Sequence, residues 1–474
     1  MKKFWQRNHE KIFHLVSLGF IFLYTIASLI VVLNRYWQYQ NFYFDFGIFD
    51  SAIWKVSRFQ LPFVDHVDYG DTNIMIFGNH FNPSIFLFSP LFWITSKSEI
   101  LLIAQTLCVS MASYIAFLIA KDKIKNRLAA FSLVFAFLGY VGLQNALISD
   151  FHDATVAVLP MMLLFWAFLK EKWKLYFICL FIILGLKESF AGFGLALSLF
   201  MLLRNKKYWK ISLTTLLISC LWGYLAIKIV IPYFSGGVYF FAPKNHPGNV
   251  FDLVSRFYDP LLKLKTIVFS YATFGFLPIF NLASLPLIFE NFFERYVLSD
   301  GRGLDLGMHY NAPLSVFLFM GSLFTLMYLE KRKNLRRLIA PWAMLTVISV
   351  IILHRFILRG PLGLVYNRDF YKQNVGVAYV NNFIAQVPKE GLIMTQNDLA
   401  TRFTHGDVKL LRRNYALISP DFVALNLTPG QNPNSYFPLS QKEAEGLKNA
   451  LMKDNNYSLK KYADELYLFS KIEK

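Results

Sequence analysis

The sequence predicts an all-α polytopic membrane protein with a small α/β domain at its C-terminal end. Only 16% of the 474 residues are charged and 55% are hydrophobic, with a mean hydropathy of +0.40, whereas soluble domains carry about 25% charged residues. The apolar residues form long runs, such as 12–33 and 211–231, each long enough to cross a bilayer as a helix. This pattern excludes a soluble enzyme, a disordered chain and an outer-membrane barrel, whose strands alternate in polarity.

The net charge of +18 follows a membrane topology rather than a nucleic-acid surface. Twenty basic and four acidic residues lie in five short segments, at 1–11, 121–127, 170–174, 204–210 and 330–337. Basic loops of this kind mark the cytoplasmic side. The sequence therefore predicts a multi-pass protein of the plasma membrane with its N-terminus inside, and nucleic acid is not expected as a partner.

Taken in order, these loops predict about eleven crossings and an extracytoplasmic C-terminus. A first helix is followed by a long outer loop, 34–83, and by a short apolar segment, 84–96, that Pro90 marks as re-entrant or interfacial. The 29 residues between two inner basic loops are expected to hold two short or broken helices, with one tilted span as the alternative. The remaining spans are expected at 99–120, 128–147, 155–169, 211–231, 264–296 as a hairpin, 313–329 and 338–357.

The composition changes at Leu358, where the apolar runs become short. We therefore divide the chain into a membrane domain, 1–357, and a soluble domain, 358–474. Within the soluble domain, strands are expected at 391–396, 408–411 and 422–427, helices at 370–387 and 440–452, and a closing hairpin at 457–469.

The first outer loop carries the strongest catalytic candidates, Asp45 and Asp50. They lie five residues apart among aromatic residues, which in a helix would separate them by roughly 140°. A carboxylate in apolar surroundings tends to have a raised pKa, which suits a general base. For Asp45, a metal ligand or a cap of the helix beginning near Gly47 are the alternatives.

Four further groups of polar residues are expected on the outer side. His80 could orient a phosphate, bind a metal or bond to the backbone. Asp150, His152 and Asp153 form a turn rich in metal-capable ligands, and Lys187-Glu188 is a charged pair at membrane depth, where charges normally mark function. His309-Tyr310 opens a later helix and is a weaker candidate.

Phosphate binding needs cations, and four arginines are predicted on the outer face: Arg295, Arg302, Arg355 and Arg359. Arginine suits bidentate phosphate contacts, although Arg355 and Arg359 could equally reach lipid headgroups. The sequence has no Walker-type loop, dinucleotide fingerprint or serine-nucleophile motif, so ATP is not expected as a direct fuel.

Together these residues carry a resemblance to a known family. Asp45 to Asp50, Asn79-His80-Phe81, Asp150-Phe151-His152, Lys187-Glu188 and His309-Tyr310 resemble a family of predicted prokaryotic membrane proteins, domain of unknown function 2079. The overall plan is also similar to the GT-C glycosyltransferases.

That resemblance implies a transferase that uses a polyprenyl-phosphate-linked sugar as donor. Asp45, with Asp50 nearby, would be the general base that activates an envelope glycan, lipid or protein acceptor. The donor would be bound by His80, His152, Lys187, Glu188, Arg295, His309, Tyr310 and Arg355. The C-terminal domain would help to bind the acceptor. Separately from the resemblance, the polar turn at 150–153 could hold a divalent cation, Mg²⁺ or Mn²⁺, through Asp150 and Asp153.

Two other functions remain open at this stage, a secondary transporter and a non-catalytic envelope protein. Transporters place charges at the bilayer midplane and contain inverted repeats, whereas here the charges gather at one face and no repeat is visible. A buried Glu188 would be hard to explain in a scaffold.

Overall fold

The computed structural model describes residues 2–237, 239–242, 247–299, 303–372, 375–462 and 465–472. Arg302 lies outside these residues. The described chain forms two compact units that interleave in sequence. The first comprises Met1–Val32, His80–Ser84 and Ile103–Tyr366, and the second Leu33–Asn79, Ile85–Leu102 and Asn367–Lys474. The C-terminal segment thus folds together with most of the first outer loop.

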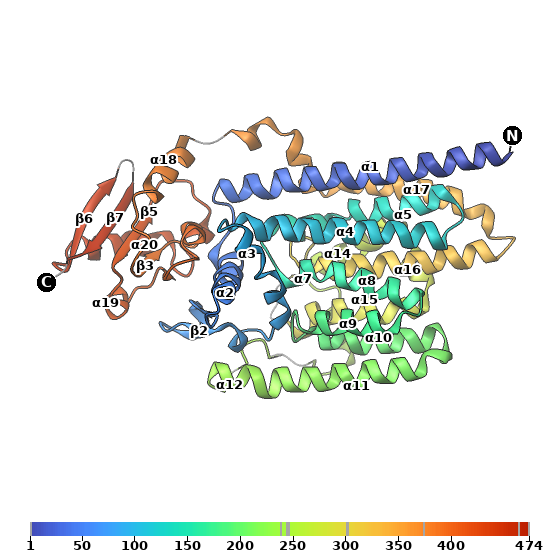
Figure 1. Ribbon diagram of the computed structural model, residues 1–474, viewed down its shortest axis with the longest axis horizontal. Coiled ribbons are helices and arrows are strands. Elements are labelled where there is room, and N and C mark those ends of the chain that lie inside the picture. The colour runs from blue at the N-terminus through green and yellow to red at the C-terminus, as the bar shows by residue number, and fades with distance from the viewer. Residues whose placement is uncertain are drawn as a thin grey trace. The chain divides into compact units, whose positions relative to one another are not determined.

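The first unit is helical, and several of its helices run side by side in Figure 1. It contains most of α1 (Lys2–Trp37) and α4 (Glu99–Lys123), which both continue into the second unit. The other helices of this unit are α5 (Arg127–Gly139), α6 (Val141–Ser149), α7 (Asp153–Val156), α8 (Val158–Leu169), α9 (Trp173–Leu184), α10 (Phe190–Arg204), α11 (Trp209–Leu225), α12 (Ile231–Ser235), α13 (Val250–Ser255), α14 (Leu261–Thr273), α15 (Leu285–Phe293), α16 (Asn311–Lys331) and α17 (Ile339–Ile352).

Within the described residues, five helical stretches are long and apolar enough to span a membrane, and a sixth is added if α5 and α6, bent by 41°, form one span. The five are Glu10–Trp37, Glu99–Lys123, Lys206–Ser235, Asn311–Lys331 and Arg336–Ile357. This supports a multi-pass membrane protein. The higher figure of eleven crossings requires the shorter apolar helices α8, α9 and α10 to cross as well, and also the hairpin predicted at 264–296, which holds α14 and α15. That figure stays a prediction.

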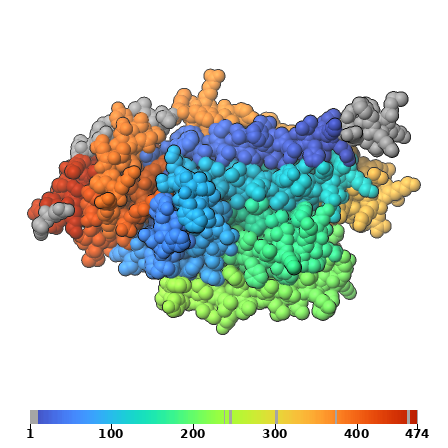
Figure 2. Space-filling model, in the orientation of Figure 1, coloured from blue at the N-terminus to red at the C-terminus, as the bar shows by residue number. Residues whose placement is uncertain are grey.

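The core of the first unit surrounds α16, because 89% of its most apolar stretch is buried, against 28% for the stretch that includes α11. Figure 2 shows α11 in light green along one border of the unit. Exposed leucines such as Leu217 and Leu221 cover this helix, as expected for a surface that faces lipid. α10 packs along both α11 and α15. A Cβ at Gly194 would collide with the Ser219 hydroxyl, so this glycine permits the close approach of α10 and α11.

The second unit contains a five-stranded mixed sheet of order β4-β3-β5-β7-β6, flanked in Figure 1 by α18 and α20. β3 pairs in parallel with β4 and β5, whereas β7 is antiparallel to β5 and β6. The strands are β3 (Ile393–Thr395), β4 (Val408–Leu410), β5 (Phe422–Asn426), β6 (Tyr457–Tyr462) and β7 (Leu466–Lys471), and the helices are α18 (Val375–Ile384), α19 (Tyr415–Ile418) and α20 (Gln441–Leu451). The three predicted strand ranges contain β3, β4 and β5.

The first outer loop contributes shorter elements to the same unit. They are α2 (Ile48–Ser57), the antiparallel pair β1 (Phe63–Val64) and β2 (Ile74–Met75), and α3 (Leu91–Ile94). A buried ion pair fixes this loop to the sheet, because both carboxylate oxygens of Asp65 accept from Arg412 Nη2 at 3.1 Å and Oδ2 also accepts from the Leu410 amide at 2.9 Å.

Candidate functional site

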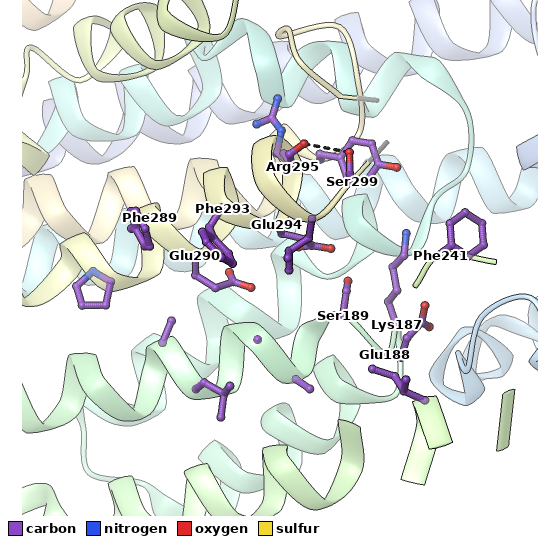
Figure 3. A pocket seen from close by; sticks show the side chains of 18 of the residues that line it. Lys187, Glu188, Ser189, Phe241, Phe289, Glu290, Phe293, Glu294, Arg295 and Ser299 are labelled. Carbon is purple, nitrogen blue, oxygen red and sulfur yellow. Dashed lines mark hydrogen bonds between the residues drawn. The ribbon is translucent and has the colours of Figure 1, made fainter. Parts of the chain in front are cut away.

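The first unit contains a cavity of about 980 Å³ between α10 and α15. Its wall is mainly apolar, and polar side chains lie along one part of it (Figure 3). The apolar lining is Ala191, Gly192, Leu195, Ala196, Leu199, Ile227, Phe241, Leu282, Leu285, Pro286, Phe289, Phe293 and Leu298. The polar lining is His80, Lys187, Glu188, Ser189, Tyr239, Glu290, Glu294, Arg295, Ser299 and Tyr310.

His80 and Glu188 form a dyad at the wall of this cavity. His80 Nδ1 lies 2.7 Å from Glu188 Oε1, and the imidazole stacks on the Phe241 ring with 4.3 Å between centroids. The other Glu188 oxygen accepts from the Phe81 amide at 3.1 Å, and Tyr239 donates its hydroxyl to Oε1 at 2.9 Å. Glu188 therefore fixes the imidazole through Nδ1, and Nε2 is the ring nitrogen that makes no hydrogen bond within the described part of the chain.

Lys187 is the exceptional cation of the site. Its side chain is buried, and its Nζ lies 5.6 Å from the centre of the Tyr310 ring. Among the described residues, no carboxylate forms an ion pair with it. A buried ammonium is costly in an apolar environment, and Asp153, Glu188 and Glu294 interact with this one electrostatically without forming an ion pair. The arrangement is thus suited to an anionic ligand.

Two carboxylates, Glu290 and Glu294, face the same cavity from successive turns at the end of α15 (Figure 3). Glu290 packs against the backbone of α10, because a Cβ at Gly192 would lie 2.5 Å from Glu290 Oε1. Neither glutamate has an ion-pair partner in the described part of the chain. Carboxylates so placed accept hydrogen bonds, and sugar hydroxyls are suitable donors.

Arg295 lines the cavity, but its guanidinium is already bound within the protein. Nε donates to the Gly303 carbonyl at 2.8 Å, Nη1 to Asn311 Oδ1 at 2.9 Å and Nη2 to the Asp305 carbonyl at 2.9 Å. Arg295 therefore holds the segment that leads to Tyr310, which lines the cavity itself. This placement argues for a positioning role rather than direct contact with a phosphate.

His152 and His309 lie together beside this site. Their rings stack at 3.3 Å between centroids, and His152 Nδ1 lies 2.7 Å from Asp153 Oδ1. All three side chains are buried, and none of them lines the cavity. The structure thus brings these predicted residues together as a buried cluster next to Tyr310.

The metal hypothesis for Asp150 and Asp153 gains no further ligands from the structure. In the described residues, no three His, Cys, Asp or Glu side chains are grouped as a metal site requires. Asp153 is instead paired with His152, and the backbone carbonyl of Asp150 accepts from Gln105 Nε2 at 2.9 Å. Arg355 is exposed, beyond α17, and is not part of the cavity wall.

The two aspartates of the first outer loop have different surroundings in the second unit. Asp50 is fully buried, and its Oδ2 accepts from the hydroxyls of Ser98 (2.7 Å) and Thr404, with His405 Nε2 at 3.3 Å. Asp45 is half-buried and has φ 139° and ψ −79°. α2 is capped at Gly47 without a side-chain bond, so capping does not explain Asp45.

Comparison with known proteins defines the family. Residues 35–468 match the family described as predicted membrane protein (DUF2079). The chain belongs to this family. No curated protein gives a significant match.

Among solved structures, this DUF2079 chain is similar to ArnT from Cupriavidus metallidurans bound to undecaprenyl phosphate. The two share 10% identical residues with a TM-score of 0.56, and the match covers 96% of this chain and 98% of that chain. At this identity the likeness concerns the fold alone.

Sequence reasoning did not select Glu290 and Glu294 as site residues of this DUF2079 protein. A signal was present, because two carboxylates four residues apart in an apolar helix lie on one face. It was weak because nothing in the sequence indicated that this face would border α10 across a cavity.

Proposed function

We propose that the protein is a glycosyltransferase of the plasma membrane that moves a sugar from a polyprenyl-phosphate-linked donor to an extracytoplasmic acceptor. The observation that carries the proposal is the buried Lys187, which forms no ion pair with another described residue, together with His80 at the wall of a large apolar cavity. The similarity in fold to a protein bound to undecaprenyl phosphate supports it.

The cavity suits an amphipathic anion. Its apolar wall, from α10 and α15, would receive part of the isoprenoid chain, because burying apolar surface there is favourable by about 25 cal/mol per Å². Lys187 and His80 Nε2 would bind the phosphate. Glu290 and Glu294 would accept hydrogen bonds from sugar hydroxyls, since two carboxylates would repel a phosphate placed next to them.

The transfer itself is a displacement at the anomeric carbon. Asp45 would remove the proton from an acceptor hydroxyl, and the acceptor oxygen would form the new glycosidic bond. The bond between the anomeric carbon and the phosphate oxygen breaks, and polyprenyl phosphate leaves with the electron pair. Lys187 and His80 would stabilise the negative charge that develops on the departing phosphate. Asp50 has no assigned step, because its carboxylate is buried in hydrogen bonds to Ser98 and Thr404.

The proposal also includes the orientation of the chain in the membrane. The N-terminus would be cytoplasmic and the second unit extracytoplasmic, with about eleven crossings in total. Envelope glycans, lipids or proteins would be the acceptors.

Reconstituted protein tests this function in two steps. The first measures binding of undecaprenyl phosphate by native mass spectrometry for the wild type and for Lys187→Met. We expect binding to weaken at least about 100-fold, as for removal of a hydrogen-bonded charge partner. Arg355→Gln is the matched control, since this exposed arginine lies outside the cavity wall. Equal binding by wild type and Lys187→Met would contradict the assignment of the cavity.

The second step measures the transfer of sugar from polyprenyl-phosphate-linked donors. Asp45→Asn should reduce kcat by about 100-fold or more, because general-base assistance is worth about 10²–10⁴-fold. Undecaprenyl phosphate binding should be unchanged in that variant. Full transfer activity in Asp45→Asn would exclude Asp45 as the base.

A further inference from the structure

The backbone at Asp45 adopts a conformation that the protein must actively hold. Its φ of 139° lies in the region that favours glycine, and Phe44 before it has a non-helical ψ of 79°. Residues other than glycine rarely adopt this backbone conformation. They keep it only where contacts with the surrounding structure hold the backbone in place. The contacts that hold the segment therefore decide where the Asp45 carboxylate points.

The two amides that precede Asp45 are both bound by one residue of the C-terminal segment, Asn397. The Tyr43 amide donates to the Asn397 carbonyl at 2.7 Å, and the Phe44 amide donates to Asn397 Oδ1 at 2.9 Å. These bonds fix consecutive peptide groups directly before the strained residue.

Asn397 is itself held in place on its other side. Its amide donates to the Ser435 carbonyl at 2.9 Å, and its Nδ2 donates to the Asn434 carbonyl at 3.0 Å. Only 3% of the residue is exposed. The side chain of Asn397 thus accepts one hydrogen bond through Oδ1 and donates another through Nδ2, and a side-chain amide can do both at once.

Packing keeps the neighbouring side chains fixed as well. The Tyr43 ring is buried, and a Cβ at Gly47 would collide with it. The Phe44 ring packs against Phe437 at 4.9 Å and against His66 at 5.1 Å between centroids. The first outer loop and the residues that follow β3 therefore form one rigid assembly around Asp45.

We propose that Asn397 is a positioning residue for the reaction: by binding the Tyr43 and Phe44 amides, it sets the direction of the Asp45 carboxylate. This inference rests on the proposed function, in which Asp45 is the base. It makes the C-terminal segment part of the catalytic apparatus, beyond a module that binds the acceptor.

Asn397→Leu tests the proposal, because leucine keeps the volume and loses both side-chain hydrogen bonds. We expect kcat to fall at least about 10-fold with an unchanged KM for the donor, since small misplacements of a catalytic group are costly. Asn397→Asp keeps the acceptor for the Phe44 amide and should recover part of kcat. The Phe44 amide should also exchange with solvent faster in Asn397→Leu than in the wild type.

A matched control separates positioning from general loss of stability. Thr395→Val removes another buried side-chain hydrogen bond two residues before Asn397, at the end of β3, from Thr395 Oγ1 to the Ala424 carbonyl at 2.8 Å. It should lower thermal stability without lowering kcat at temperatures well below its unfolding. If Asn397→Leu does not fold, Asn397→Ser, which is too short to reach the Phe44 amide, is measured instead with the same readings.

The outcomes distinguish this inference from the proposed function. If Asp45→Asn abolishes transfer while the Asn397 variant keeps kcat within twofold of wild type, the positioning role is wrong and the general base stands. If Asp45→Asn retains full transfer, the proposed function of Asp45 fails, and the positioning role fails with it.

Discussion

Buried charges are treated differently in the cavity of the first unit and in the packed loops of the second. In the second unit, Asp65 is bonded to Arg412, Lys409 and the Leu410 amide. In the cavity, the buried Lys187 and the half-buried Glu290 and Glu294 have no ion-pair partner among the described residues. In the second unit the charge of Asp65 is therefore satisfied within the protein, whereas the charges of the cavity in the first unit are left for a ligand.

The difference shows that burial of a charge does not by itself mark function. A buried ion pair with complete hydrogen bonding holds two segments together, and removing one partner leaves the other uncompensated. A buried charge that faces a cavity is a candidate for binding what enters the cavity. Variants that target each kind of charge should therefore affect different measurements.

The largest expected effect on stability is at Asp65. Asp65→Ala would leave the buried Lys409 without its ion-pair partner and Arg412 with only Asp71, at 3.8 Å. We expect a loss of about 3–5 kcal/mol in the free energy of unfolding. Thermal unfolding and protease resistance in detergent measure it. Asp369→Ala, which removes an exposed ion pair with Lys372, is the control and should change stability by less than about 1 kcal/mol. Equal effects at both positions would contradict the contrast between the pairs.

Asp398 is an intermediate case, because it is buried with hydrogen bonds but has no ion-pair partner among the described residues. Burial raises its pKa from 3.8 to about 6, against the opposing bonds from Ser435 and the Leu399 amide. Because the folded-state pKa is the higher one, the stabilising contribution is complete below pH 3.8 and is lost as the pH rises through about 6.

The full loss at neutral pH corresponds to about 3 kcal/mol. Asp398→Asn should remove this dependence, so that unfolding temperatures between pH 4 and pH 8 vary less than in the wild type. The same pH profile in both proteins would show that Asp398 does not titrate in this way.

The smallest effects on stability are expected for alanine substitutions of two glycines, one in the first outer loop and one at the cavity. In Gly47→Ala the new Cβ would collide with the buried Tyr43 ring, and we expect a loss of about 1–3 kcal/mol. In Gly192→Ala the Cβ would meet only the flexible end of Glu290, 2.5 Å away, at the cavity. Stability should change little there, whereas binding of the sugar-bearing donor should weaken several-fold as Glu290, the proposed acceptor for sugar hydroxyls, is displaced. A large loss of stability in Gly192→Ala, with none in Gly47→Ala, would contradict this description of the two sites.

Much of the fold class could be predicted from the sequence. Long apolar runs such as 12–33 predict helices because the bilayer core offers no other partner for backbone groups. Strands β3, β4 and β5 were predicted from their short apolar runs between turn residues. The number of crossings could not be settled in this way, because α9 and α10, with 12 and 15 residues, are shorter than a usual span.

The candidate site was predicted in part. His80, Lys187 and Glu188 were selected because charged and histidine residues in apolar sequence are expensive, and the structure places all three at the cavity. Arg295 was selected as a cation of the outer face that could bind phosphate, yet its guanidinium is bound by the carbonyls of Gly303 and Asp305. The sequence does not indicate that the segment with Gly303 and Asp305 folds back onto Arg295, because a backbone carbonyl can accept a hydrogen bond whatever the residue type.

The sequence by itself determined that the protein is a helical membrane protein, which polar residues are costly, and that the composition changes near Leu358. Periodicity and hydropathy act locally, so the residues alone determine these properties. Only the tertiary structure decided which costly residues are satisfied, that the first outer loop and the C-terminal segment fold as one unit, and that Asn397 holds the backbone before Asp45. Those contacts join residues more than 300 positions apart, and no local pattern in the sequence encodes such a pairing.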